Sequence, residues 1–214
     1  ILLTAMGQTL LMALCGLFFA CILGLIFGML SVLKNKVCNV IAQIFVDVIR
    51  GVPMIVLAYF VFFGIPYALK SFFGISISFT ALVAGTICLA LNCGAYMSEI
   101  IRAGIQSVDK GQMEAARSLG LSKSQAMVKV VMPQAIKYIL PAIGNECIAL
   151  LKETSVAGYV AVVDVTKAAT NIRNKTYDAV NPIILLALIY LVMVVALTRL
   201  LAIMERRLRK SDGK

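Results

Sequence analysis

Five long apolar segments constrain this chain more than any other feature. They lie at about 2–33, 37–63, 79–101, 138–160 and 179–201. Each is long enough for a membrane-spanning helix, which needs about 20 residues. Of the 214 residues, 61% are hydrophobic and 14% are charged. A soluble domain of this size could not bury so much apolar surface. The sequence therefore predicts a single all-α integral membrane domain over 1–214, with five transmembrane helices.

The distribution of basic residues predicts the orientation of these helices. Lys34 and Lys36 follow the first segment, and the tail "ERRLRKSDGK" follows the fifth. Further basic residues lie between the third and fourth segments: Lys110, Arg117, Lys123, Lys129 and Lys137. Because basic loops stay in the cytoplasm, we expect the N-terminus outside and the C-terminus inside. The same rule explains the net charge of +10, so we expect a lipid bilayer and no nucleic acid as partner.

The cysteine and histidine content argues against metal and disulfide chemistry. The six cysteines lie in or beside apolar runs without a C-x-x-C pair, and the sequence has no histidine. We therefore expect neither a disulfide framework nor a metal site. The chain starts at Ile1, so a short leading segment is expected to be missing, and the uncharged residues 1–33 indicate a first span rather than a cleaved signal peptide.

The polar stretch between the third and fourth segments has the pattern of two short capped helices. Asp109 is a candidate N-cap with Gln112 three residues later, and Ser122 repeats this spacing with Gln125. Gly120 lies between them, where a residue with positive φ would end the first helix. We expect the second helix to end at Pro133. The alanines at 115 and 116 would let another surface approach the first helix closely.

The order of Glu114, Ala115, Ala116, Gly120 and Pro133 resembles the cytoplasmic Glu-Ala-Ala motif of ATP-binding-cassette (ABC) importer permeases. Three further stretches are similar to the polar-amino-acid branch of that family: "RGVP", "AYMSEIIRAGIQSVDKGQMEAARSLGLS" and "MPQAIKYILPAIGNECIALLKETSVAG". The resemblance covers nearly the whole chain. The departures are small, with Met132 and Val130 where larger aliphatic residues are usual and Glu153 where aspartate is usual.

This resemblance implies a type I ABC importer permease fold with a cytoplasmic coupling segment at about 105–133. The implied partners are two ATPase subunits that bind ATP-Mg, a second permease subunit that is expected to be an identical copy, and an extracytoplasmic solute-binding protein. The implied location is the plasma membrane of a prokaryote, as a multi-pass protein. The implied coupling residues are Asp109, Glu114, Ala115, Ala116 and Gly120. The sequence has no G-x-x-x-x-G-K-[ST], so we expect a transport subunit that is not an enzyme and holds no cofactor.

Charged residues inside the apolar segments are candidates for function, because each costs roughly 2.5–3.5 kcal/mol on insertion scales. Asp47 and Arg50 lie three residues apart, and we expect them to pair with each other. Glu99 and Arg102 have the same spacing at the cytoplasmic end of the third segment, where charged side chains reach water easily. These two pairs therefore have a structural explanation.

Glu146 and Glu153 lie seven residues apart and hence on one face of the fourth segment, roughly 10 Å apart along its axis. Pro141 and Gly144 precede them and could loosen the helix there. Either Lys152 or a neighbouring subunit neutralises these carboxylates, or they form a cation-accepting face along the transport route. The candidate substrate-binding residues are Glu146, Glu153, Asp47, Asn145, Thr154 and Ser155.

We therefore interpret the chain as the membrane-spanning subunit of an ATP-driven importer for a polar amino acid, with a basic one (arginine-, lysine- or histidine-like) as the narrower hypothesis. The alternative is a passive channel or a gradient-driven secondary transporter, in which the intramembrane acids would relay ions. That alternative gives no reason for the Glu-Ala-Ala segment. A membrane enzyme is disfavoured, because the sequence has no histidine and no G-x-S-x-G motif.

Overall fold

The computed structural model describes residues 1–211, and the side chains of residues 1–204; within that range the secondary structure is helical without strands. The basic tail from residue 205 lies outside the described side chains. The α-helices are α1 (Leu2–Val32), α2 (Lys36–Gly51), α3 (Met54–Tyr59), α4 (Ile65–Phe73), α5 (Ala81–Gln106), α6 (Lys110–Ser118), α7 (Lys123–Ala126), α8 (Met132–Glu153), α9 (Val165–Thr176) and α10 (Asn181–Ser211). Two π-helical turns (Phe60–Gly64 and Met127–Val131) and one 3₁₀ turn (Thr154–Val160) join some of them.

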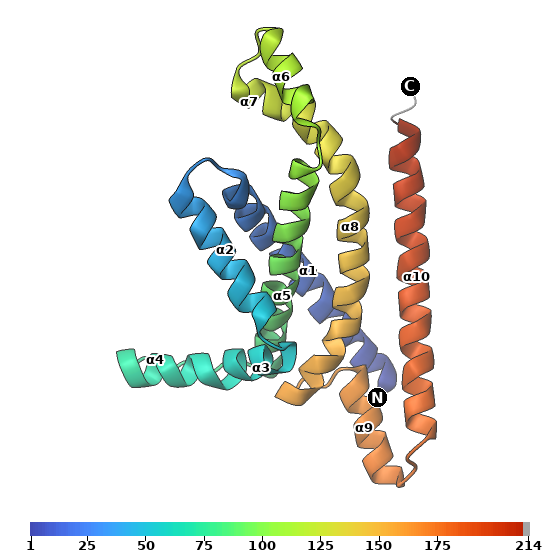
Figure 1. Ribbon diagram of the computed structural model, residues 1–214. Coiled ribbons are helices and arrows are strands. Elements are labelled where there is room, and N and C mark those ends of the chain that lie inside the picture. The colour runs from blue at the N-terminus through green and yellow to red at the C-terminus, as the bar shows by residue number, and fades with distance from the viewer. Residues whose placement is uncertain (212–214) are drawn as a thin grey trace.

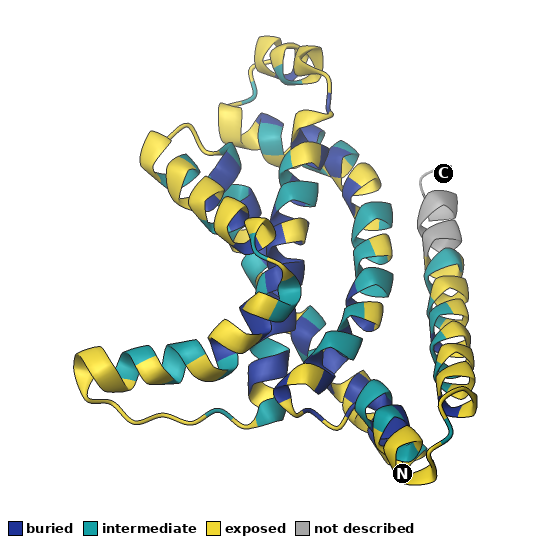
Figure 2. Ribbon diagram, turned by 60° about the horizontal axis from the view of Figure 1, so that its bottom comes forward, coloured by how far each residue is buried: buried dark blue, intermediate teal, exposed yellow. Residues whose placement is uncertain are grey.

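Five helical runs in the described chain are long and apolar enough to cross a membrane, which confirms the predicted class. Figure 1 shows the N-terminus at one end of the molecule, and α6, α7 and the C-terminal end of α10 at the other. This arrangement agrees with the predicted topology, in which the N-terminus and the α6–α7 segment lie on opposite sides of the membrane. In Figure 2 most of α10 is exposed, as expected for a helix that faces lipid or another subunit.

A row of small residues lets α1 lie directly against α5. Gly16, Ala20, Gly24 and Gly28 recur every four residues on α1, and all four are buried. A Cβ atom built on Gly24 would lie 2.5 Å from the Cβ of Met97 on α5, so only glycine fits there. In a membrane, where lipid competes with apolar side chains, such close backbone packing is a main source of helix association.

Replacing Gly24 by alanine should therefore destabilise the protein by about 1–3 kcal/mol, because α1 or α5 must move to admit one methyl group. Gly7 is the matched control on the same helix, since a Cβ there would meet nothing within 4 Å. Thermal unfolding in detergent, followed by circular dichroism, measures the effect. A melting temperature for Gly24→Ala equal to that of Gly7→Ala would contradict the proposed role of this contact.

The prediction of one continuous second span over 37–63 is wrong. The helix α2 ends at Gly51, Val52 is extended, and Pro53 precedes the start of α3 at Met54. The cause is local, because a proline has no amide hydrogen and disfavours helical backbone in the residue before it. Figure 1 shows α3 and α4 running across the direction of α2, near the end that holds the N-terminus. The second apolar run of the structure is instead Met54–Phe73, which comprises α3, the π-helical turn Phe60–Gly64 and α4.

The prediction that a helix ends at Pro133 is also wrong. The helix that begins at Lys123 passes through the π-helical turn Met127–Val131 and continues into α8. Pro133 lies two residues after this π-helical turn, and such a local change of helical hydrogen bonding accommodates a residue without an amide hydrogen. Further along, α8 continues through Pro141, and Figure 2 shows that this helix is curved. The curvature is the expected effect of a proline inside a helix.

Candidate functional site: an acidic face on α8 and a capped cytoplasmic segment

The two candidate carboxylates on α8 both face α5. Glu153 accepts a hydrogen bond of 2.9 Å from the side-chain amide of Asn92, which is buried on α5. Glu146 lies beside the thiol of Cys93, the next residue on α5. Both glutamates are half-buried. The seven-residue spacing therefore places both carboxylates at the boundary between the same two helices.

The neighbours of these two carboxylates on α5 are neutral. The side-chain amide of Asn92 donates to Glu153, and the thiol of Cys93 lies beside Glu146. Lys152 is exposed and makes no salt bridge to Glu153. The charge of Lys152 nevertheless acts on the Glu153 carboxylate, so neutralisation by Lys152 or by a neighbouring subunit stays a prediction. Two half-buried acids that keep free hydrogen-bond capacity are suited to accept cationic groups.

The expected pair between Asp47 and Arg50 does not form. Both side chains are exposed, and the guanidinium carbon of Arg50 instead lies 4.7 Å from the ring centre of Tyr96 on α5. The second expected pair is confirmed, because Arg102 donates from Nε to Glu99 at 3.0 Å and forms a salt bridge to the same carboxylate. Arg50 is therefore stabilised by an aromatic face rather than by its neighbouring acid.

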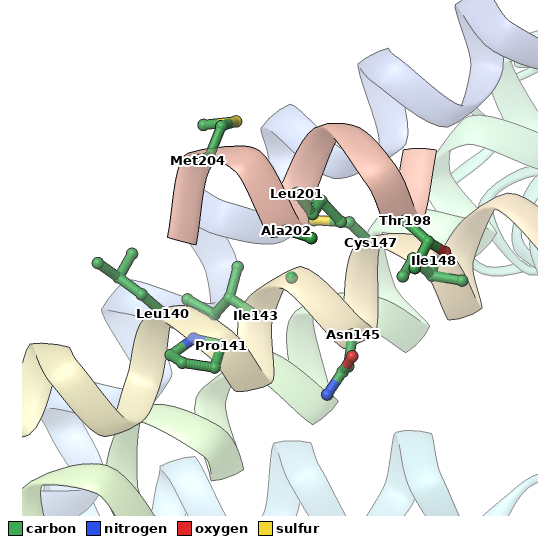
Figure 3. A pocket seen from close by; sticks show the side chains of 11 residues that line it. Leu140, Pro141, Ile143, Asn145, Cys147, Ile148, Thr198, Leu201, Ala202 and Met204 are labelled. Carbon is green, nitrogen blue, oxygen red and sulfur yellow. The ribbon is translucent and has the colours of Figure 1, made fainter. Parts of the chain in front are cut away.

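Three other predicted substrate residues adjoin the two acids in the sequence but make different contacts. Asn145 is exposed and lines a largely apolar cavity of about 280 Å³ between α8 and α10; Figure 3 shows its side chain directed away from α10. Thr154 is buried, and its hydroxyl donates to the carbonyl of Leu151 at 2.7 Å and lies 3.3 Å from the hydroxyl of Tyr190. Ser155 is half-buried in the 3₁₀ turn that follows. Their binding roles stay predictions.

Polar side chains connect α9 and α10 to Thr154, the residue that follows α8. The hydroxyl of Tyr190 on α10 lies 3.2 Å from that of Thr166 on α9, so it joins α9 to the end of α8. The buried side chain of Asp164 caps α9 by accepting hydrogen bonds from the backbone amides of Thr166 and Lys167. Burial raises the pKa of Asp164 above the ordinary aspartate value, although these hydrogen bonds oppose that shift.

The predicted cytoplasmic segment has the expected local structure. Asp109 accepts a hydrogen bond from the backbone amide of Gly111 at the start of α6, and Gly120 has a φ of +88° just after its end. Ser122 and Gln125 form the complete capping box that begins α7. Gln112 departs from the prediction, because its side chain accepts a 3.1 Å hydrogen bond from Gln134 on α8 instead of capping α6.

Three residues of the Glu-Ala-Ala motif divide between two faces of α6. Glu114 and Ala115 are exposed, whereas Ala116 is buried at 4% exposure. Ala115 is thus available for close approach by another protein, and Ala116 instead supports the packing of α6 on its own chain. The carbonyl of Ala116 accepts a hydrogen bond from the amide of Leu121, which closes the turn around Gly120.

Comparison with known proteins identifies the class that this fold and segment define. Residues 20–210 match the family described as "Binding-protein-dependent transport system inner membrane component". This chain belongs to that family, and it lies in a bacterial inner membrane as a multi-pass component.

Similar proteins narrow the class to permeases of amino-acid ABC importers. The arginine transport system permease protein ArtQ of Bacillus subtilis is 39% identical over 191 residues, covering 89% of this chain and 84% of ArtQ. The "Probable glutamine ABC transporter permease protein GlnM" of the same organism is 36% identical over 204 residues, covering 95% and 91%. A crystal structure of an amino acid ABC transporter with histidines matches with a TM-score of 0.86 at 39% identity, covering 96% of this chain and 93% of that one.

Sequence reasoning missed the α5 side of the site. Asn92 and Tyr96 lie four residues apart within the third apolar segment, on the helix face that meets Glu153 and Arg50. The available signal was the polar Asn92 in an otherwise apolar run. A polar side chain at that depth needs a partner, but its identity depends on which helix packs against it.

Proposed function

We propose that this chain forms the translocation pathway for a basic amino acid in an ATP-driven importer. The observation that supports the narrower substrate class is the pair of half-buried carboxylates, Glu146 and Glu153, with neutral partners on α5. An α-ammonium group would occupy one carboxylate for any amino acid. A second carboxylate favours a cationic side chain, because charge-assisted hydrogen bonds are stronger than neutral ones, especially away from water.

The coupling role belongs to the α6–α7 segment. Glu114 and Ala115 are exposed on α6, where a separate ATPase subunit can dock. The Gln112–Gln134 hydrogen bond links α6 to α8, which carries both acids. We infer an assembly of two copies of this chain, two ATPases that bind ATP-Mg and an external binding protein that delivers the substrate. If ATP binding moves α6, then α8 would transmit that movement to Glu146 and Glu153.

Reconstitution tests this function directly. Liposomes that contain the permease with its ATPase and binding protein should take up arginine only when ATP is supplied, and arginine should outcompete glutamine. Native mass spectrometry of the same complex should show two permease chains and two ATPases. Uptake that follows a pre-formed ion or substrate gradient in the absence of ATP would instead support the channel or secondary-transporter alternative, and so would lone permease chains in the presence of excess ATPase.

A further inference from the structure

The helical run Met54–Phe73 turns away from α2 instead of extending it. Figure 1 shows α3 and α4 lying across α2, near the end of the molecule that holds the N-terminus. Because α2 already leads from the cytoplasmic side to the outer side, a further crossing by Met54–Phe73 would start α5 in the cytoplasm. The basic α6–α7 segment would then lie outside, against the positive-inside rule. The charge distribution therefore leaves this run on the outer side without a crossing of its own.

The helices beside this run indicate the depth at which it begins. The 16 residues of α2 extend about 24 Å, which is about 6 Å less than the hydrocarbon core of a bilayer. On α5, the thiol of Cys88 donates to the carbonyl oxygen of Met54 at 3.8 Å, and Cys88 lies about 10 Å along that helix from its outer end at Ala81. Met54 therefore lies at the depth of about 5–10 Å that interfacial helices occupy, at the boundary between headgroups and acyl chains.

The helix α4 has an apolar and a polar face. At 100° per residue its apolar side chains fall on one side of the helix and its polar ones on the opposite side: Ile65, Leu69, Phe72 and Phe73 against Tyr67, Lys70 and Ser71. Phe72 and Phe73 are 80% and 72% exposed, so this chain leaves its own apolar face uncovered. A helix that crosses the hydrocarbon core needs no polar face, whereas a helix that lies at the membrane–water boundary needs one.

We propose that α4 is an interfacial anchor whose partner is the outer leaflet of the lipid bilayer. Its apolar face enters the acyl chains, Tyr67 lies among the headgroups, and the ammonium of Lys70 binds lipid phosphates. Charge favours lipid as the occupant, because Lys70 is the only charged residue between Arg50 and Glu99. The polar face thus offers a cation to anionic phosphates, whereas a second copy of α4 would bring the same cation and no acid.

Tryptophan fluorescence tests this placement, because the sequence has no tryptophan of its own. Phe63→Trp and Phe72→Trp put single probes at two exposed positions of the run, and Phe73→Trp is the alternative should Phe72→Trp not fold. The matched control is Val192→Trp, at an exposed position of α10 about 16 Å from its outer end. The purified full chain is inserted into liposomes of phosphatidylethanolamine and phosphatidylglycerol, in which the acyl chains carry bromine either near the headgroup or near the bilayer centre.

Both probes in the run should be quenched about twofold more strongly by the shallow bromines than by the deep ones, and Val192→Trp should show the reverse order. If Met54–Phe73 crossed the bilayer, the probe at Phe63 would lie about 13 Å deeper than the probe at Phe72. Stronger quenching of Phe63→Trp by the deep bromines therefore overturns the proposal. Protection of Phe72→Trp from both lipids and from aqueous iodide would reveal a protein partner such as a second copy, and it overturns the proposal as well.

The contact of Lys70 with phosphates has its own test in the Phe72→Trp background. Lys70→Glu should raise quenching by aqueous iodide about twofold, because an acid is repelled by anionic headgroups and lifts the helix toward water. Lys70→Arg keeps the charge and should leave the quenching unchanged. Equal iodide quenching of Lys70→Glu and Lys70→Arg refutes the phosphate contact.

Discussion

Glu153→Gln should reduce uptake of arginine about tenfold more than uptake of glutamine. The substitution keeps the shape of the side chain, and its amide oxygen can still accept the hydrogen bond from Asn92, so α8 should stay in place against α5. Only the charge is lost. A hydrogen bond to a charged partner contributes about 1.5–3 kcal/mol and a neutral one about 0.5–1.5 kcal/mol, and the difference corresponds to roughly a factor of ten.

Competitive uptake into liposomes measures this selectivity for the parent, Glu153→Gln and Glu146→Gln. Lys152→Gln is the matched control, because Lys152 is adjacent in sequence, exposed, and lies about 100° away around the helix. Equal losses for arginine and glutamine would assign a structural role to the acids. Unchanged uptake of both substrates would show that the carboxylates do not contact the transported molecule, and the basic-substrate proposal would then be wrong.

Gly120→Val should abolish most of the substrate-stimulated ATP hydrolysis while the permease still inserts and folds. Gly120 has a φ of +88°, and a Cβ atom there would meet nothing within 4 Å, so the cost is backbone strain and not a clash. For a β-branched residue that strain is about 1–3 kcal/mol, enough to reorient α6 relative to α7. Glu114→Lys should have a similar effect for a different reason, because it reverses the charge of an exposed residue on the docking helix.

Two substitutions separate these effects from general damage to the segment. Gly120→Asn should retain most of the stimulation, because asparagine adopts left-handed backbone more easily than valine. Glu114→Gln should lose less than Glu114→Lys. The readout is ATP hydrolysis by the reconstituted complex with and without substrate and binding protein. Full stimulation in Gly120→Val and Glu114→Lys would exclude α6 as the coupling element.

The local features of this protein could be predicted from the sequence because they depend on residues close together in the chain. The five apolar segments follow from length and composition, and the caps at Asp109 and Ser122 and the turn at Gly120 follow from short-range hydrogen bonding and backbone sterics. The break at Pro53 has an equally local cause, and the prediction missed it only because the apolar run continued through the proline. Pro133 shows the converse, because the preceding π-helical turn let the helix continue into α8.

The tertiary structure decided which of the charged residues act together. The spacing of Glu146 and Glu153 fixed their common face, but only the packing of α8 on α5 gave Glu153 the amide of Asn92. Spacing alone favoured a pair between Asp47 and Arg50, yet the ring of Tyr96 holds Arg50 instead. Partners on other helices depend on helix rotation and close approach, which at α1 and α5 are set by residues as small as Gly24. Such contacts between distant residues leave no periodic signal in the sequence of either helix.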